Sequence, residues 1–274
     1  MKKLLIASTA LSFAFVAIPA SAATLFALDN GSDTLVSIDT TTNVFTDIGA
    51  LGTDANFGDL AYGNSTLYML GGRNNENLYT VDTATGAATL VGNHGIGDLF
   101  GLAFDASTGK LYASQFLNGG GFYEIDANTG AATLVGNTGT RIGGMTYRGD
   151  TNQLVGTNDG TGDFFGLDPA NGDQTLLGGD GFVNNSDLAF DGDLGVYWLL
   201  DFSGDFYQYN ADTLSRTLIS NTGRQFDGLA YTGSIGTMGA VPEPATWAFM
   251  IFGFGAIGGA MRRQRKANVK VSYA

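Results

Sequence analysis

Short runs of alternating apolar and polar residues return along residues 23–236 with a nearly constant period. One apolar segment that ends in Asp or Asn occurs five times, at residues 35–39, 78–82, 122–126, 164–168 and 206–210. The starts of these segments lie 42 to 44 residues apart. Three of the copies lead through an Asp-x-x-x-Gly turn into a further apolar segment, as at residues 82–86 and 88–92. Period-two alternation between turns predicts β-strands.

Two further segments complete each repeat. A strand of small residues, typified by Gly-Leu-Ala-Phe, occurs at residues 59–62, 101–104, 144–147, 187–190 and 228–231. Another strand follows the first four copies, at residues 66–70, 110–114, 153–157 and 196–200, and residues 24–28 supply a fifth. Four strands in each of five repeats predict an all-β fold, a five-bladed β-propeller with four-stranded blades. The small-residue strands are expected beside the axis, where the blades crowd together.

The order of the strands predicts how this ring closes. The body begins on the second strand of a blade and ends, near Tyr231, on the first strand of a blade. We therefore expect one blade to combine strands from both ends of the body, which removes two exposed sheet edges. The predicted propeller occupies residues 23–236, and we expect it to be a monomer.

Residues 1–22 have the pattern of a secretory signal peptide. Lys2 and Lys3 precede an uncharged apolar run, and Ala20 and Ala22 provide small residues for cleavage. We expect cleavage after Ala22. A retained N-terminal membrane anchor is the alternative, although the apolar run is short for a span.

The other end of the chain has a different pattern. Residues 237–244 are expected to form a linker, because Pro242 and Pro244 break regular structure. Residues 245–261 carry no charge and would span about 26 Å as a transmembrane helix. Basic residues begin the segment 262–274, which the positive-inside rule places in the cytoplasm.

This C-terminal pattern resembles the PEP-CTERM protein-sorting signal. The matching residues are Pro242, Glu243, Pro244, Trp247, Arg262 and Arg263. The resemblance covers residues 241–274 and implies export in a Gram-negative bacterium, with an inner-membrane-anchored precursor. It also implies recognition by an exosortase, removal of the tail near Pro-Glu-Pro, and association with exopolysaccharide or biofilm matrix at the cell surface or outside the cell. An ordinary membrane anchor is the alternative.

Composition narrows the chemistry further. The chain of 274 residues has a formal net charge of -13, but residues 23–240 hold 25 acidic and only six basic residues. Such an acidic body is a poor partner for nucleic acid or anionic lipid. The expected partners are divalent cations or an acidic polysaccharide bound through bridging cations. The absence of cysteine excludes disulfides and thiolate zinc sites. His94 is the single histidine, expected as a solvated loop residue, with a general base as the alternative.

Aspartates give the strongest candidate site. Asp59, Asp98, Asp187 and Asp227 fall before the predicted axial strands. Their carboxylates could converge on Ca²⁺, the candidate cofactor, or could accept hydrogen bonds from turn amides. The aspartate of each Asp-x-x-x-Gly segment is expected to cap a turn.

Aromatic residues in predicted loops suit sugar stacking, namely Phe116, Phe182 and Phe202, whereas Trp198 is expected in the core. The sequence shows no nucleophile–base constellation. It therefore favours an exported, non-enzymatic protein that binds or builds matrix polysaccharide. The alternative is a calcium-dependent propeller hydrolase or lactonase with its site at the axial mouth.

Overall fold

The computed structural model describes residues 23–117, 120–182, 186–233 and 235. The predicted signal peptide, linker, transmembrane helix and basic tail lie outside these residues. Within the described part, no helix is long and apolar enough to cross a membrane.

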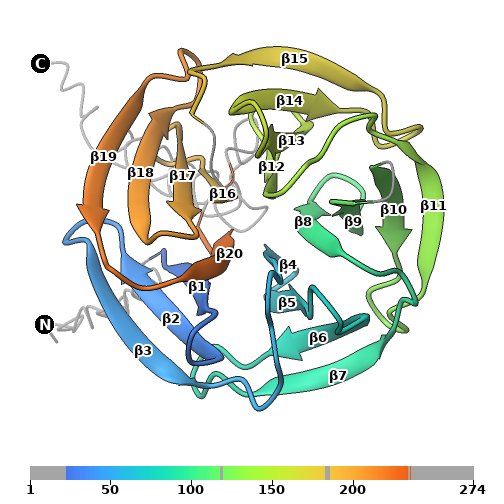
Figure 1. Cartoon of the computed structure of the whole chain (residues 1–274), viewed down its shortest axis with the longest axis horizontal. Helices are drawn as coiled ribbons and strands as arrows, with labels where there is room; N and C mark the ends of the chain where they lie inside the picture. Colours follow the sequence, from blue (N-terminus) through green and yellow to red (C-terminus); the bar gives the residue numbers. More distant parts are fainter. Residues whose placement is uncertain (1–22, 118–119, 183–185, 234, 236–274) are drawn as a thin grey trace, which may run out of the picture.

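Five four-stranded antiparallel sheets surround a central axis, which confirms the predicted five-bladed propeller (Figure 1). The innermost strands are β4 (Leu60–Gly63), β8 (Leu99–Asp105), β12 (Met145–Arg148), β16 (Ser186–Asp191) and β20 (Phe226–Tyr231). The second strands are β1 (Leu25–Asp29), β5 (Thr66–Leu70), β9 (Lys110–Gln115), β13 (Gln153–Asn158) and β17 (Val196–Asp201). The third strands are β2 (Thr34–Asp39), β6 (Asn77–Val81), β10 (Gly121–Ile125), β14 (Asp163–Leu167) and β18 (Asp205–Asn210). The outer strands are β3 (Val44–Ala50), β7 (Ala88–Asn93), β11 (Ala132–Asn137), β15 (Gln174–Gly179) and β19 (Arg216–Asn221).

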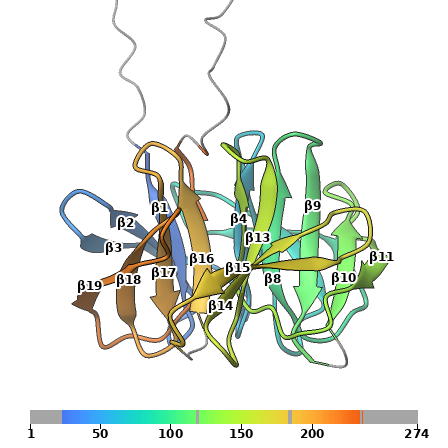
Figure 2. The ribbon, with the colours of Figure 1, turned by 90° about the horizontal axis from the view of Figure 1, so that it is seen from above.

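The ring closes as the sequence predicts, by a blade built from both ends of the body. This blade has the strand order β20-β1-β2-β3. Leu25 lies opposite Tyr231, and Asp29 lies opposite Phe226. Beyond the strands, the Thr232 amide donates to the Thr24 carbonyl at 3.0 Å. The first and last strands of the body therefore meet in one sheet, and the chain enters and leaves at the same face of the ring (Figure 2).

The hydrophobic core lies between the blades. Each of five clusters of buried side chains joins two neighbouring blades. Leu28 and Leu35 of one blade, for example, pack with Met69 and Tyr79 of the next. Trp198, predicted in the core, is only 2% exposed and stacks on Phe206. Because every interface buries apolar area from two sheets, each blade depends on both of its neighbours.

Aspartates cap the hairpins between the third and outer strands. Oδ1 of Asp82 accepts the amides of Ala84 and Thr85 at 2.8 and 3.0 Å, and Asp39 and Asp126 repeat this pattern. These hydrogen bonds hold the pKa of Asp82 below its ordinary value. The Asp-x-x-x-Gly segment is therefore a turn cap, as the sequence predicts.

The same hairpins dock on the neighbouring blade through glycine. Gly49, Gly92 and Gly136 lie on outer strands against the backbone of the next blade's hairpin. A Cβ at Gly136 would overlap the carbonyl oxygen of Asn171. This repeated glycine is thus required by the close approach of two backbones.

The substitution Gly136→Ala tests this contact. Because the new methyl group meets backbone, we expect the free energy of unfolding to fall by about 1–3 kcal/mol. Urea denaturation measures it. Gly97→Ala is the matched control, since a Cβ there has only the Glu76 carboxylate at 3.7 Å. Equal stability of Gly136→Ala and wild type would show that the outer strands do not pack as described.

Candidate functional site at the acidic mouth

The central channel has a small hollow at each end of the innermost strands. At the end where these strands begin, the hollow is lined by Phe57, Gly58, Phe100, Gly143, Asp159, Asp187 and Asp227. We call this end the acidic mouth. The hollow has a volume of about 20 Å³, which is room for about one water molecule.

Carboxylates at the acidic mouth tie the innermost strands together. Asp59 is fully buried and accepts the amides of Leu60 at 2.7 Å, Leu102 at 2.6 Å and Leu229 at 3.3 Å. It therefore links three blades. Asp187 accepts the Gly228 amide at 2.6 Å. These are the hydrogen bonds that the capping interpretation predicts.

Asp227 completes this set of links, since it accepts the Phe57 amide at 3.0 Å. Burial raises the pKa of Asp227 to about 7, against the lowering effects of the Phe57 amide and nearby Arg73. Burial also raises the pKa values of Asp59 and Asp187 well above their ordinary value. For Asp187, the neighbouring charges of Asp59, Asp227 and Asp159 add to the rise. The acidic mouth therefore carries less negative charge than its residue types suggest.

Four phenylalanines form a stack along the rim of the acidic mouth. Phe202 stacks on Phe57 with ring centroids 5.1 Å apart, Phe57 on Phe100 at 5.4 Å, and Phe100 on Phe116 at 4.9 Å. Phe100 is buried, whereas the other three rings are partly exposed. Phe57 and Phe100 also line the hollow. The stack thus forms both a wall of the hollow and an apolar rim beside it.

Two arginines cover this stack. The Arg73 guanidinium lies 4.4 Å from the Phe57 ring centroid, and Arg141 lies 5.3 Å from that of Phe116. Such cation–π contacts favour the charged guanidinium over an aromatic face. Arg73 also forms an ion pair with Asp98 at 3.6 Å.

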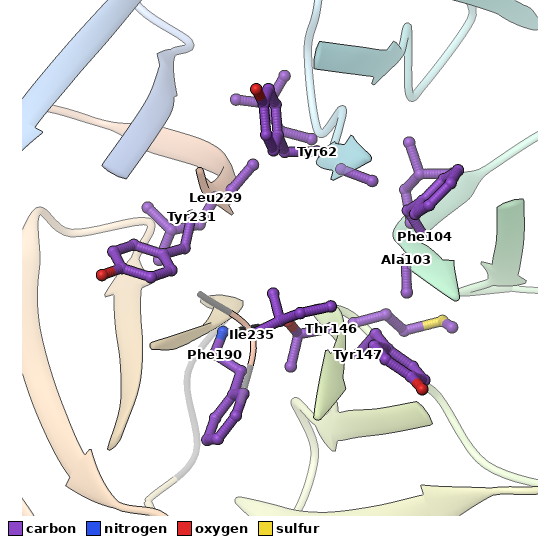
Figure 3. A pocket seen from close by; sticks show the side chains of 14 residues that line it. Tyr62, Ala103, Phe104, Thr146, Tyr147, Phe190, Leu229, Tyr231 and Ile235 are labelled. Carbon is purple, nitrogen blue, oxygen red and sulfur yellow. Dashed lines mark hydrogen bonds between the residues drawn. The ribbon is translucent and has the colours of Figure 1, made fainter. Parts of the chain in front are cut away.

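The opposite end of the channel is apolar. One aromatic residue from each innermost strand surrounds it: Tyr62, Phe104, Tyr147, Phe190 and Tyr231 (Figure 3). Ile235, just beyond β20, lines the same hollow. The Gly149 amide donates to the Ile235 carbonyl at 2.8 Å. The last described residue of the body therefore lies at this end, which we call the exit mouth.

The structure brings together three of the four residues that the sequence groups as calcium ligands. Asp187 and Asp227 line the hollow, and Asp59 lies buried near them. Asp98 instead pairs with Arg73 at the rim. Among the described residues, no group of three or more His, Cys, Asp or Glu side chains is arranged to hold a metal ion. Calcium binding stays a prediction, which the amide contacts of Asp59 do not favour.

Other candidates fall in different places. Phe116 and Phe202 belong to the stack, but Phe182 packs on Tyr207 and under the Arg216 guanidinium instead. His94 is not a solvated loop residue, because it is only 7% exposed, and burial lowers its pKa to about 4. Its Nδ1 accepts the Ile96 amide at 3.3 Å. The neutral ring therefore has a structural role.

Sequence reasoning also missed residues of the acidic mouth. Asp159, Phe57 and Phe100 all line the hollow. Asp159 lies between a second and a third strand, Phe57 lies in the loop before β4, and Phe100 is the second residue of β8. A comparison of all five repeats at these loop positions would be the only signal for them.

Comparisons with known proteins identify the end of the chain. Residues 240–266 match the PEP-CTERM protein-sorting motif. The chain carries a PEP-CTERM sorting signal. The protein is therefore exported and sorted, from a membrane-anchored precursor of the kind found in Gram-negative bacteria, and the motif implies processing by exosortase-type machinery.

Residues 6–141 match a family described as a repeat of unknown function. A sequence search of curated proteins finds no match.

Solved structures share the fold of the propeller that precedes this sorting signal. A structural genomics protein of unknown function from Bacteroides thetaiotaomicron matches with a TM-score of 0.55 and 15% identity. The match covers 77% of this chain and 62% of that one, so this chain spans under two thirds of that protein. A chain of the nidogen/laminin complex matches with a TM-score of 0.54 and 10% identity, over 77% and 99% of the two chains. At these identities the likeness concerns the fold alone.

The substitution Asp227→Asn tests the electrostatics of the acidic mouth. The raised pKa of Asp227 means that its stabilising contribution is complete below pH 4 and is lost as pH rises through about 7. An asparagine side chain does not titrate and can still accept the Phe57 amide. We expect the variant to be more stable than wild type by about 2 kcal/mol at pH 8 and of similar stability at pH 4. Urea denaturation across this pH range measures both.

Asp82→Asn is the control with the opposite sign. The lowered pKa of Asp82 gives stability that is present above pH 4 and lost as the pH falls further. The free energy of unfolding of Asp82→Asn at pH 8 should therefore not be higher than that of wild type. Parallel pH profiles for Asp227→Asn and wild type would contradict the burial of Asp227.

Proposed function

We propose that this protein is a non-enzymatic binding propeller of the extracellular matrix, and that its acidic mouth is the face that engages matrix polysaccharide. The observation that carries this proposal is the position of the two mouths. The exit mouth and the acidic mouth lie at opposite ends of the innermost strands. Ile235, the last described residue, lies at the exit mouth.

The sorting motif begins close to that exit. The match starts at residue 240, five positions after Ile235, and five residues reach at most about 18 Å. In the membrane-anchored precursor the exit mouth would thus face the membrane. The acidic mouth would face away from it, toward polymers outside the cell. After removal of the tail the same face stays open.

The acidic mouth also has the surface chemistry of a binding face. Phe57, Phe116 and Phe202 expose part of their rings at the rim. Partly exposed aromatic side chains beside charged groups are typical of recognition surfaces. The hollow itself admits about one water molecule, so a polymer would lie across the rim. The hydrolase alternative has less support, because Asp59, Asp187 and Asp227 each accept amide hydrogen bonds between blades.

The test is a co-sedimentation assay of the exported protein with exopolysaccharide from the bacterium that makes it. Wild type should sediment with the polymer, and Phe116→Ser should weaken binding by about tenfold, because it removes a partly exposed ring of the stack. Leu176→Ser is the matched control, since Leu176 is 60% exposed on an outer strand away from the mouth. Absence of binding by wild type, or equal losses in the two variants, would refute the proposal.

A further inference from the structure

The basic residues of the body are few, and nearly all are neutralised within it. Residues 23–240 contain six basic residues against 25 acidic ones. The following ion pairs account for five of the six: Arg73–Asp98, Lys110–Glu124, Arg148–Asp150, Arg216–Asp180 and Arg224–Asp29. Arg141 alone forms no ion pair with any described residue. In a body with four times more acids than bases, an unpaired arginine is unexpected.

Arg141 lies at the rim of the acidic mouth. It is exposed, and Gly143, two residues further on, lines the hollow. Its guanidinium sits 5.3 Å from the Phe116 ring centroid at the end of the phenylalanine stack. Phe116 itself is partly exposed. A solvent-accessible cation thus stands beside an apolar surface.

Local charge at this rim differs from the strongly negative average of the body. Asp98 at the rim is paired with Arg73. Burial favours the neutral forms of Asp187 and Asp227 beneath it. Charges on more distant blades are screened over about 8 Å at physiological ionic strength. Asp159, which lines the hollow beside Gly143, adds negative charge. An anionic group that approaches Arg141 therefore meets a mouth that is less negative than its residue types suggest, although not a neutral one.

We propose that Arg141 and Phe116 form a binding site for a carboxylate-bearing sugar unit of an acidic polysaccharide. This inference rests on the proposed function and names the class of polymer. The planar guanidinium matches a carboxylate with two parallel hydrogen bonds. The apolar C–H surface of the same sugar ring packs on the exposed part of Phe116. A single uronate-type unit satisfies both groups, whereas a neutral sugar leaves Arg141 unpaired.

This site differs from binding through a bridging divalent cation. A cation bridge would join polymer carboxylates to aspartates, and chelation of the cation would abolish it. Direct pairing with Arg141 does not depend on metal and weakens as salt concentration rises. Chelator and salt therefore separate the two modes.

The experiment measures binding of the exported protein to polygalacturonate, with and without EDTA, and to the same polymer with its carboxylates reduced to alcohols. We expect wild type to bind polygalacturonate in EDTA and to bind the reduced polymer at least about tenfold more weakly. Arg141→Gln should bind polygalacturonate at least about tenfold more weakly than wild type does, and its affinity for the reduced polymer should not change. Arg141→Lys should recover only part of the loss, because lysine keeps the charge without the planar fork.

Lys110→Gln is the matched control. It changes the net charge equally, but Lys110 is paired with Glu124 at the start of β9, toward the exit mouth. It should bind as wild type does. Denaturation midpoints equal to wild type would show that both variants are folded.

Three results would overturn this inference: unchanged affinity in Arg141→Gln, equal losses in Arg141→Gln and Lys110→Gln, or loss of wild-type binding in EDTA. The producer's exopolysaccharide serves as the parallel ligand. If wild type binds that polymer without any dependence on Arg141, the proposed function stands and this inference fails. If wild type binds neither polymer, both fail.

Discussion

The antiparallel pairing of β20 with β1 is the constraint on which the rest of the structure depends. The chain has no cysteine, so no disulfide can hold the ring closed. Closure rests on the strand pairing from Leu25–Tyr231 to Asp29–Phe226 and on the adjoining threonine contacts. This pairing sets β20 beside β4, where Asp227 accepts the Phe57 amide and Asp59 accepts the Leu229 amide. The acidic mouth is therefore a product of ring closure rather than of any single blade.

The acidity of the body has a largely structural origin. Asp is short enough to bond backbone amides two and three residues ahead, and the repeats use it wherever a tight turn follows a strand. Asp29 and Asp105, which end strands, hold turns in the same way as Asp82. Twenty-three of the 25 acidic residues between 23 and 240 are Asp, and only Glu76 and Glu124 are Glu. A strongly negative charge thus accompanies the fold. Against this background, an exposed basic residue such as Arg141 indicates a site where an anionic group can bind.

The repeat made the fold predictable, and its irregularities made the site difficult to predict. Period and strand number could be inferred because the strands recur five times in the sequence, and the two-ended blade could be inferred because the body begins on a second strand and ends on a first strand. The capping role of Asp59 and Asp187 was one of two interpretations, because sequence alone does not show whether a carboxylate faces amides or a cation. Asp98 lies at the rim in an ion pair with Arg73, and the approach of these two separate loops is not visible in the sequence. The phenylalanine stack combines Phe100 of β8 with three loop residues, of which Phe116 and Phe202 follow the second strands β9 and β17 at equivalent positions. These phenylalanines do not recur in all five repeats, so the repeat pattern alone does not reveal the stack. His94 looked like a loop residue, although its neighbours bury it.

The acidic mouth, opposite the last described residue of the body, is the proposed binding face for matrix polysaccharide. Amide hydrogen exchange of the exported protein, with and without the producer's exopolysaccharide, tests this most directly. Binding at this face should slow exchange around the acidic mouth, at residues 54–59, 71–76, 97–101 and 139–144. The exit-mouth loops at residues 64–65, 106–109, 149–152 and 192–195 should exchange at the same rate in both samples. Protection confined to those exit-mouth loops or to the outer strands would contradict it.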